Sequence, residues 1–252
     1  MKYYFLATYL PELSREDKRV RLGVADLLAD RGLLADEDWR EVDLVRLARD
    51  VVMVERLLAG RPVAVPQALH DLDFWREQQK APSEGPDFIQ AFLRAQAGGE
   101  FGPRQVDRLW AAYYDHVLEQ SRNPLLRAWA GFERDLRNIL AALRARRQGL
   151  TVAEHLVGDS DLVAALARAN AEDFGLGRDY PWLERLMAAK EPQELQAMVD
   201  QILWDFLEQN TGADPFAFEA ILAYLLKLMM VERRLALDEE AGMALVRQLE
   251  EA

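Results

Sequence analysis

The amino-acid sequence predicts an all-α fold, and three observations support that prediction. Apolar residues recur every three or four positions, which is the spacing of a helix with one buried face. Residues that start and stop helices bound most of these segments. Alternation typical of β-strands is nearly absent. The exception is Tyr3 to Tyr9, which fits either an extended segment or a first helical turn.

The N-terminal half contains predicted helices separated by glycine or proline. Ser14 is a candidate N-cap for the first of them, and Gly32 would stop it. Gly60 follows the second, the segment APSEGP interrupts the chain after the third, and Gly98 follows the fourth. In chain order, the predicted ranges are Ser14 to Gly32, Asp38 to Ala59, Leu69 to Lys80, Asp87 to Ala97 and Pro103 to Ser121.

The C-terminal half continues the same pattern. Asn123 would cap a helix that has Pro124 at its first position and ends at Gly149. Thr151 and Glu154 have the spacing of a capping box for a short helix. The remaining predicted ranges are Ser160 to Ala171, Pro181 to Ala189, Pro192 to Gln209, Asp214 to Leu237 and Glu239 to Glu250.

A short internal echo suggests repeated antiparallel helical units. VMVERLLA, residues 52–59, returns as MMVERRLA, residues 229–236, with differences only at the first and sixth positions. Each copy ends a long predicted helix. Because helices share composition, the match is explained either by true repetition or by chance. We expect a single all-α domain, residues 1–252, built of helical sub-units that cover about 1–100, 101–190 and 191–252.

Composition excludes several classes of protein. The chain has no cysteine, which excludes disulfides, thiolate zinc sites and cysteine nucleophiles. Its formal net charge of −12 would repel nucleic-acid phosphates, so we expect no nucleic-acid partner. The longest apolar segment, Ala220 to Val231, contains Lys227 and is too short to cross a membrane.

Known catalytic patterns do not occur in the sequence. It lacks a P-loop, a dinucleotide-binding fingerprint, a nucleophile elbow and the His-Glu-x-x-His zinc motif. His70 is predicted to be a surface histidine, and His116 and His155 to make local polar contacts. We predict no catalytic residue, no cofactor and no metal site. The alternative is an enzyme that uses the acidic cluster from Asp36 to Glu41 with a divalent metal.

The predicted helix over residues 124–149 carries a row of arginines in this acidic chain. Its apolar face comprises Trp129, Phe132, Leu136, Ile139, Leu140 and Leu143. A second stripe comprises Arg134, Arg137, Arg144 and Arg147. Asn138 lies almost opposite the apolar face, so we expect an outer position there, either solvated or held for a contact.

Two explanations fit the arginines at the end of this helix. Cations complement the negative C-terminal end of a helix, which accounts for them without a partner. Alternatively, they meet an acidic partner or the acidic helices of this chain. On the second explanation, the candidate partner-interface residues are Asp135, Arg137, Asn138, Arg144, Arg146 and Arg147.

Several segments resemble a known family. The pattern D-L-x-N-I, then an apolar residue, then L-R-x-R-x-x-G, at Asp135 to Gly149, resembles the recurring helix of the C subunit of V-type and archaeal-type ATPases, called d in eukaryotes. AILAYLLKLMMVER resembles the last such helix of that family. The N-terminal YYFLATYLPEL and the tail LALDEEAGMALVRQLEE resemble a bacterial family of unknown-function proteins. The genes of that family lie in V-type ATPase operons that lack an ordinary C subunit. The chain departs from the C subunit in its shorter length and in Met229 and Met230, where that family has acidic residues.

The resemblance implies a non-catalytic role. The C subunit of those ATPases consists of three similar helical units around a pseudo-threefold axis, which form a funnel that seats the rotor shaft on the membrane c-ring. By this resemblance we expect a central-stalk subunit for ion transport, with the shaft subunits and the c-ring as partners. It would lie on the cytoplasmic face of the inner membrane, held there through those partners. The alternative is a free-standing all-α scaffold or regulatory protein unconnected to ATPases.

Overall fold

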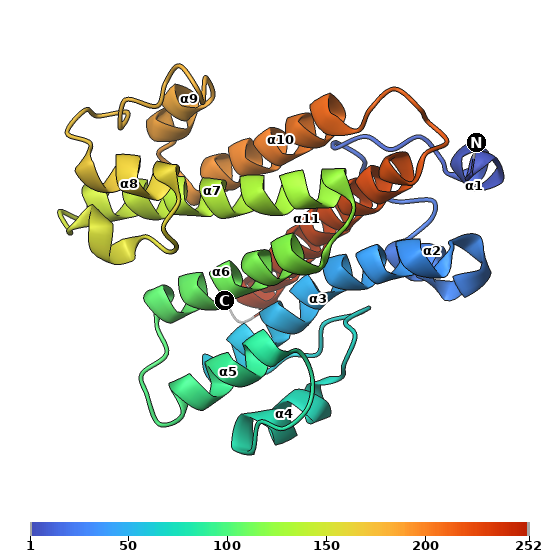
Figure 1. Ribbon diagram of the computed structural model, residues 1–252, viewed down its shortest axis with the longest axis horizontal. Coiled ribbons are helices and arrows are strands. Elements are labelled where there is room, and N and C mark those ends of the chain that lie inside the picture. Colours follow the sequence, from blue (N-terminus) through green and yellow to red (C-terminus); the bar gives the residue numbers. More distant parts are fainter. Residues whose placement is uncertain (1, 251–252) are drawn as a thin grey trace. The chain divides into compact units, whose positions relative to one another are not determined.

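A computed structural model describes residues 2–250 of the chain, with side chains described for residues 2–238 (Figure 1). Every regular element within that range is helical, which confirms the predicted all-α class. The elements are α1 (Tyr4–Tyr9), α2 (Val24–Ala29), the 3-10 helix η1 (Arg31–Leu33), α3 (Asp36–Leu58), α4 (Leu72–Lys80), α5 (Asp87–Gln96), α6 (Pro103–Gln120), α7 (Pro124–Arg147), the 3-10 helix η2 (Val152–His155), α8 (Asp161–Arg168), α9 (Leu183–Ala188), α10 (Pro192–Asn210) and α11 (Phe218–Glu250).

The chain divides into two compact units. The terminal unit joins both chain ends, Met1–Val42 and Asp200–Ala252, and the central unit is Asp43–Val199. Helices α3 and α10 each pass from one unit into the other. These ranges differ from the three sub-units expected from the sequence, and repetition of helical units stays a prediction.

In the terminal unit, α11 contacts α1 and α2. Tyr3 fixes the N-terminal segment, because its backbone N–H donates to the Phe216 carbonyl at 3.2 Å. Its hydroxyl donates to the Asp38 carboxylate and accepts from the backbone N–H of Ala35 at 3.1 Å. Lys2 pairs with the same carboxylate at 2.8 Å. The N-terminus is therefore tied to the start of α3 by groups that satisfy one another.

In the central unit, α6 and α7 pack as an antiparallel pair. Asp107 near the start of α6 pairs with Arg144 near the end of α7, and Asp115 pairs with Arg134 in the middle. Helix α7 also contacts η2 and α8, while α5 packs on α6 and α4 on α5. The core between them includes fully buried Leu109, Tyr114, Leu126 and Ile139.

The predicted helix from Ser14 to Gly32 is wrong. Helix formation begins only at Val24, and residues 10–23 are irregular. The backbone N–H of Ser14 donates to the Asp17 carboxylate, and the N–H of Asp17 donates to the Ser14 carbonyl, which closes a turn there. Such local bonds compete with helix formation. Helix α2 then starts where Glu232 accepts from the Val24 N–H at 2.7 Å.

The predicted break between Leu237 and Glu239 is also wrong, because α11 runs without interruption from Phe218 to Glu250. Asp238 does not end the helix, since it receives a hydrogen bond from Arg234 one turn earlier at 3.2 Å. The second copy of the echo therefore lies inside a helix rather than at its end, unlike the first copy at the end of α3. Within the described part of the chain, no helix is both long enough and apolar enough to span a membrane.

The hydrogen bonds at the start of η2 differ from the predicted ones. The side chain of Thr151 makes no capping hydrogen bond, so the predicted capping box with Glu154 is wrong. The Glu154 N–H instead donates to the Thr151 carbonyl at 3.1 Å, which is the tighter turn of a 3-10 helix. Tyr4–Tyr9, left open by the sequence, is helical.

Candidate functional site

Helix α7 carries all six candidate interface residues, and its bounds follow from its end residues. The Asn123 side chain accepts from the Leu126 N–H at 3.0 Å, and Pro124 occupies the first helical position. Gly149 has φ +67, a left-handed conformation that glycine adopts at little cost, and this ends the helix. The predicted apolar face is confirmed for Leu136, Ile139 and Leu143, which are all buried.

Asn138 is not on an outer face, and the expectation of an outer position is wrong. The residue is only 1% exposed. Its carboxamide oxygen accepts from the Val157 N–H at 2.9 Å, and its Nδ2 donates to the Val157 carbonyl at 3.1 Å. The segment after η2 covers the side of α7 opposite its apolar face, so Asn138 clamps that segment to the helix.

Arg137 lies half-buried against two aromatic rings of α6. Its Cζ is 4.1 Å from the ring centroid of Trp110, and its Nε donates to the Tyr114 hydroxyl at 2.9 Å. Burial opposes the charge of the guanidinium, but Tyr114, Glu133 and Asp107 together raise the pKa of Arg137. Burial raises the pKa of the Tyr114 hydroxyl far above its ordinary value. Arg137 therefore stays charged and Tyr114 neutral.

A small cavity of about 10 Å³ opens beside Arg137, with room for about one water molecule. It is lined by Asp107, Ala111, Tyr114, Arg134, Arg137, Asn138, Ala141, His155 and Val157. Burial raises the pKa of Asp107, and Arg144 and Arg137 oppose that change. The lining therefore combines cationic donors with a carboxylate that is already paired.

Arg134 and Arg144 pair with the preceding helix. Arg134 Nη1 lies 2.9 Å from Asp115, and Arg144 Nη2 lies 3.1 Å from Asp107. The Asp107 carboxylate is well shielded, whereas the other three side chains are more open to solvent. Exposed pairs of this kind contribute little stability, typically ~0.2–1 kcal/mol, but they favour one register of α6 against α7.

Arg146 and Arg147 each bind the C-terminal end of another helix in the central unit. Arg146 donates to the carbonyls of Ala169, Ala171 and Glu172, just after α8, and its Cζ lies 3.6 Å from the Phe174 ring centroid. Arg147 donates to the carbonyls of Met187 and Ala189 at the end of α9, at 2.9 and 3.3 Å. These arginines supply donors to carbonyls that helices leave unsatisfied at their ends.

Asp135, the remaining candidate, lies half-buried on α7. Its Oδ1 is buried and has no hydrogen-bond partner within the described part of the chain. Burial raises the pKa of this carboxyl, and Arg134 opposes the change. Five of the six candidates thus make contacts inside the chain, and Asp135 is the one with an unsatisfied buried atom.

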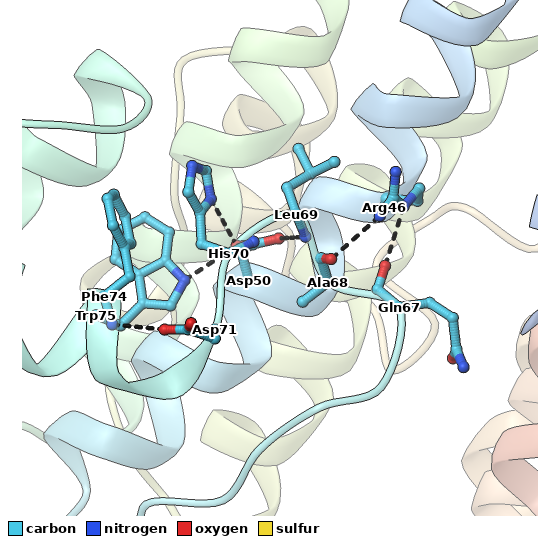
Figure 2. A network of polar contacts seen from close by, with 9 residues as sticks. All are labelled: Arg46, Asp50, Gln67, Ala68, Leu69, His70, Asp71, Phe74 and Trp75. Carbon is cyan, nitrogen blue, oxygen red and sulfur yellow. Dashed lines mark hydrogen bonds and ion pairs between the residues drawn. The ribbon is translucent and has the colours of Figure 1, made fainter. Parts of the chain in front are cut away.

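A second polar cluster surrounds Asp50, which is 0% exposed on α3 (Figure 2). Its Oδ2 accepts from the Leu69 N–H at 2.7 Å. Its Oδ1 accepts from the His70 N–H at 3.0 Å and the Trp75 Nε1–H at 3.0 Å, and it lies 2.9 Å from His70 Nδ1. These donors satisfy the buried carboxylate and delay the start of α4 to Leu72, because Leu69 and His70 are held in the preceding loop.

Arg46 lies one turn before Asp50 and holds the same loop. It donates to the carbonyls of Gln67 and Ala68 at 3.0 and 3.2 Å, as Figure 2 shows. Gln67 has φ +56, a conformation that costs free energy for a residue with a Cβ. The contacts from α3 therefore stabilise a strained loop, and the structure assigns this cluster a positioning role.

The two clusters differ in what they can do chemically. His70 stacks on Phe74 with ring centroids 4.2 Å apart, and 28% of its side chain is exposed, so it lies partly at the surface near the start of α4. Within the described part of the chain, the side-chain hydrogen bond of the His70 ring is the one with Asp50. The cavity beside Arg137, in contrast, presents charged donors to an open space.

Two carboxylates of the acidic cluster at the start of α3 bind residues of the N-terminal segment. Asp38 binds Lys2 and Tyr3, and Glu37 binds Lys2 at 2.7 Å. Among the residues that the structure describes, no group of three or more histidine and acidic side chains is placed to hold a metal ion. Sequence reasoning missed Asp50, Trp110 and Tyr114 as site residues, since each acts through a partner far away in the sequence.

Comparisons with known proteins give one match. No curated protein and no solved structure matches this chain. A family model described as "Protein of unknown function (DUF2764)" matches residues 1–252, so the chain belongs to the DUF2764 family.

Proposed function

We propose that this protein is a non-catalytic central-stalk subunit of a V-type or archaeal-type ATPase, which couples the rotor shaft to the c-ring of the membrane. The observation that carries the proposal is the resemblance of residues 135–149 to the recurring helix of the C subunit in those ATPases. The resemblance of AILAYLLKLMMVER to the last such helix adds to it.

The contacts of the resembling residues support a mechanical role. Leu136, Ile139 and Leu143 are buried in the core. Asn138 and Arg146 join α7 to the segments around η2 and after α8. Torque transmission needs a body that does not yield, and dense packing with satisfied polar cross-links gives such stiffness.

The polar groups of the chain also favour a non-catalytic role. Two carboxylates of the acidic cluster that the enzyme alternative would use, Glu37 and Asp38, are bound to Lys2 and Tyr3. The buried carboxylate of Asp50 is bound to backbone and ring N–H groups of its own unit. In the proposed complex the protein lies on the cytoplasmic face of the membrane through its partner subunits.

Affinity capture tests the proposal. The tagged protein is expressed in its native host, membranes are solubilised gently, and mass spectrometry identifies the chains that co-purify. The expected result is recovery of the catalytic head, the shaft and the c-ring together. Recovery of the protein alone, or with unrelated chains, would discard the ATPase role and favour a free-standing scaffold.

A deletion strain tests the coupling itself. Without this protein, the head is expected to hydrolyse ATP while the membranes no longer pump ions, because the shaft has no seat on the ring. The control is the same strain with the tagged protein restored. Ion pumping that persists unchanged in the deletion strain would contradict the coupling role.

A further inference from the structure

The cavity beside Arg137 has donors that no residue of the chain uses. The Nε of Arg137 is bound to Tyr114, but neither Nη group has a hydrogen-bond partner among the described residues. The guanidinium also makes no ion pair within the described part of the chain, whereas Arg134 and Arg144 pair with Asp115 and Asp107. The guanidinium of Arg137 is therefore charged and held in place, and its Nη groups remain available as hydrogen-bond donors.

His155 adds a second unused polar group to the same lining. It has no hydrogen-bond partner in the part of the chain that the structure describes, although it lies on the cavity wall. Asn138 holds Val157 on one wall, so the cavity does not depend on a loose loop. The stacking of Arg137 on Trp110 fixes the direction of its fork.

The size of the cavity limits its ligand. A volume of about 10 Å³ has room for about one water molecule, so a bound group can place only one oxygen inside. A carboxylate fits this limit, because it places one oxygen inside and leaves the other at the mouth. Arginine forks bind carboxylates with short, charge-assisted hydrogen bonds.

We propose that this cavity, lined by Arg137, His155 and Tyr114, is a binding site for the carboxylate of an acidic side chain presented by a neighbouring protein. The assignment of a carboxylate as the ligand rests on the cavity alone. The choice of a neighbouring ATPase component as the source of the carboxylate rests on the proposed function. The contact with an acidic partner is then made by the recessed Arg137, while Arg146 and Arg147 hold other parts of the chain.

A titration of the full-length protein tests the chemistry. Acetate is added at constant ionic strength, with sodium chloride as the reference salt, and the side-chain N–H signals of Arg137 and Trp110 are followed by NMR. We expect a saturable shift with acetate that chloride does not produce. Equal shifts with both salts, or saturation by phosphate but not by acetate, would overturn the carboxylate site.

Three variants make the titration specific. Arg137→Gln removes the fork and is expected to weaken acetate binding at least about tenfold. Because this variant also loses the contact with Trp110, His155→Glu provides a second test: it places a carboxylate of the chain at the cavity and should abolish the shift without loss of a hydrogen bond. Arg104→Gln, an exposed change on α6, is the charge-matched control and should bind acetate like the wild type.

Affinity capture with His155→Glu identifies the source of the carboxylate. We expect the folded variant to lose one component from the captured complex. If the variant no longer binds acetate but recovers every component, the assignment to a partner side chain is wrong. If wild-type protein recovers the ATPase subunits but shows no saturable acetate shift, the cavity proposal fails and the proposed function stands.

Discussion

At the scale of single residues, Asp50 shows how one buried charge can organise a segment of the chain. It accepts from two backbone N–H groups and the Trp75 indole, and it pairs with the His70 ring. Removal of the carboxylate would leave the buried Trp75 indole and the half-buried backbone N–H groups without this acceptor. The cost of that loss exceeds the net gain from the bonds themselves, because unsatisfied buried groups carry their full desolvation penalty.

Substitution of Asp50 tests this role. Asp50→Ala is expected to lower the free energy of unfolding by about 3–5 kcal/mol, because several N–H donors lose their acceptor at about 1–3 kcal/mol each. Asp50→Asn keeps the shape and one acceptor oxygen and should cost less. Urea unfolding, followed with the Trp75 indole signal, measures both. Asp73→Asn, at an exposed position of α4, is the control, and equal effects of Asp50→Asn and Asp73→Asn would contradict the buried role.

Asn138 gives a second prediction at this scale, since its amide both donates to and accepts from Val157. Asn138→Asp keeps the size but cannot donate at neutral pH, so its second oxygen would face the Val157 carbonyl. We expect a loss of about 2–3 kcal/mol in the free energy of unfolding. Chemical denaturation measures it, with Asn170→Asp on the surface as control. An Asn138→Asp variant as stable as that control would show that the clamp contributes nothing.

A helical wheel alone could not place Asn138 or Asp50 correctly. Asn138 does lie opposite the apolar face of α7, but that side is covered by Val157, a contact that residue spacing within the helix does not reveal. The burial of Asp50 likewise depends on the irregular loop before α4. Sequence patterns describe one element at a time, so they do not reveal contacts between elements.

At the scale of elements, the arginines of α7 act on other helices. Arg146 binds the carbonyls of Ala169, Ala171 and Glu172 after α8 and stacks on Phe174. A lysine has a single ammonium group and cannot span three carbonyls while it stacks on a ring. The arginine row at the end of α7, which the helix dipole could have explained, also joins two later segments to this helix.

Substitution at Arg146 tests this connection. Arg146→Ala should lower the free energy of unfolding by about 2 kcal/mol, as hydrogen bonds from a charged group and a cation–π contact are lost. Arg146→Lys should recover little of it. Hydrogen exchange should show faster exchange in α8 and at Phe174, with α4 unchanged. Arg168→Ala, exposed at the end of α8, is the control, and full rescue by lysine would contradict the contact as described.

The helix bounds show which parts of the sequence are informative at this scale. The ends of α7 were predictable because Asn123, Pro124 and Gly149 act locally. The prediction of a helix from Ser14 was wrong because the Ser14 N–H donates to the Asp17 carboxylate and the Asp17 N–H donates to the Ser14 carbonyl, which forms a turn. The predicted break in α11 was wrong because Asp238 is compatible with a helix when its carboxylate accepts a hydrogen bond from Arg234. Local end signals are reliable only where no competing local bond exists.

At the scale of the whole molecule, both units contain buried or half-buried tyrosines. Tyr3 and Tyr224 belong to the terminal unit, and Tyr113, Tyr114 and Tyr180 to the central unit. In every case burial is the main cause that raises the pKa of the hydroxyl above its ordinary value. The folded chain therefore disfavours phenolates in both units, while the unfolded chain accepts them freely.

The sign of this effect predicts the response of stability to alkali. A folded-state pKa above the unfolded value means that the folded state holds more protons once pH passes about 10, the ordinary pKa of tyrosine. The contribution of these tyrosines is complete below that pH and is lost above it, by about 1.4 kcal/mol per pH unit for each coupled proton. Urea unfolding across this range measures the loss.

Tyr114→Phe should be less stable at neutral pH but lose stability less steeply in alkali, whereas exposed Tyr9→Phe should follow the wild type. An alkaline slope that is the same in Tyr114→Phe and wild type would show that the buried hydroxyl of α6 takes no part in it.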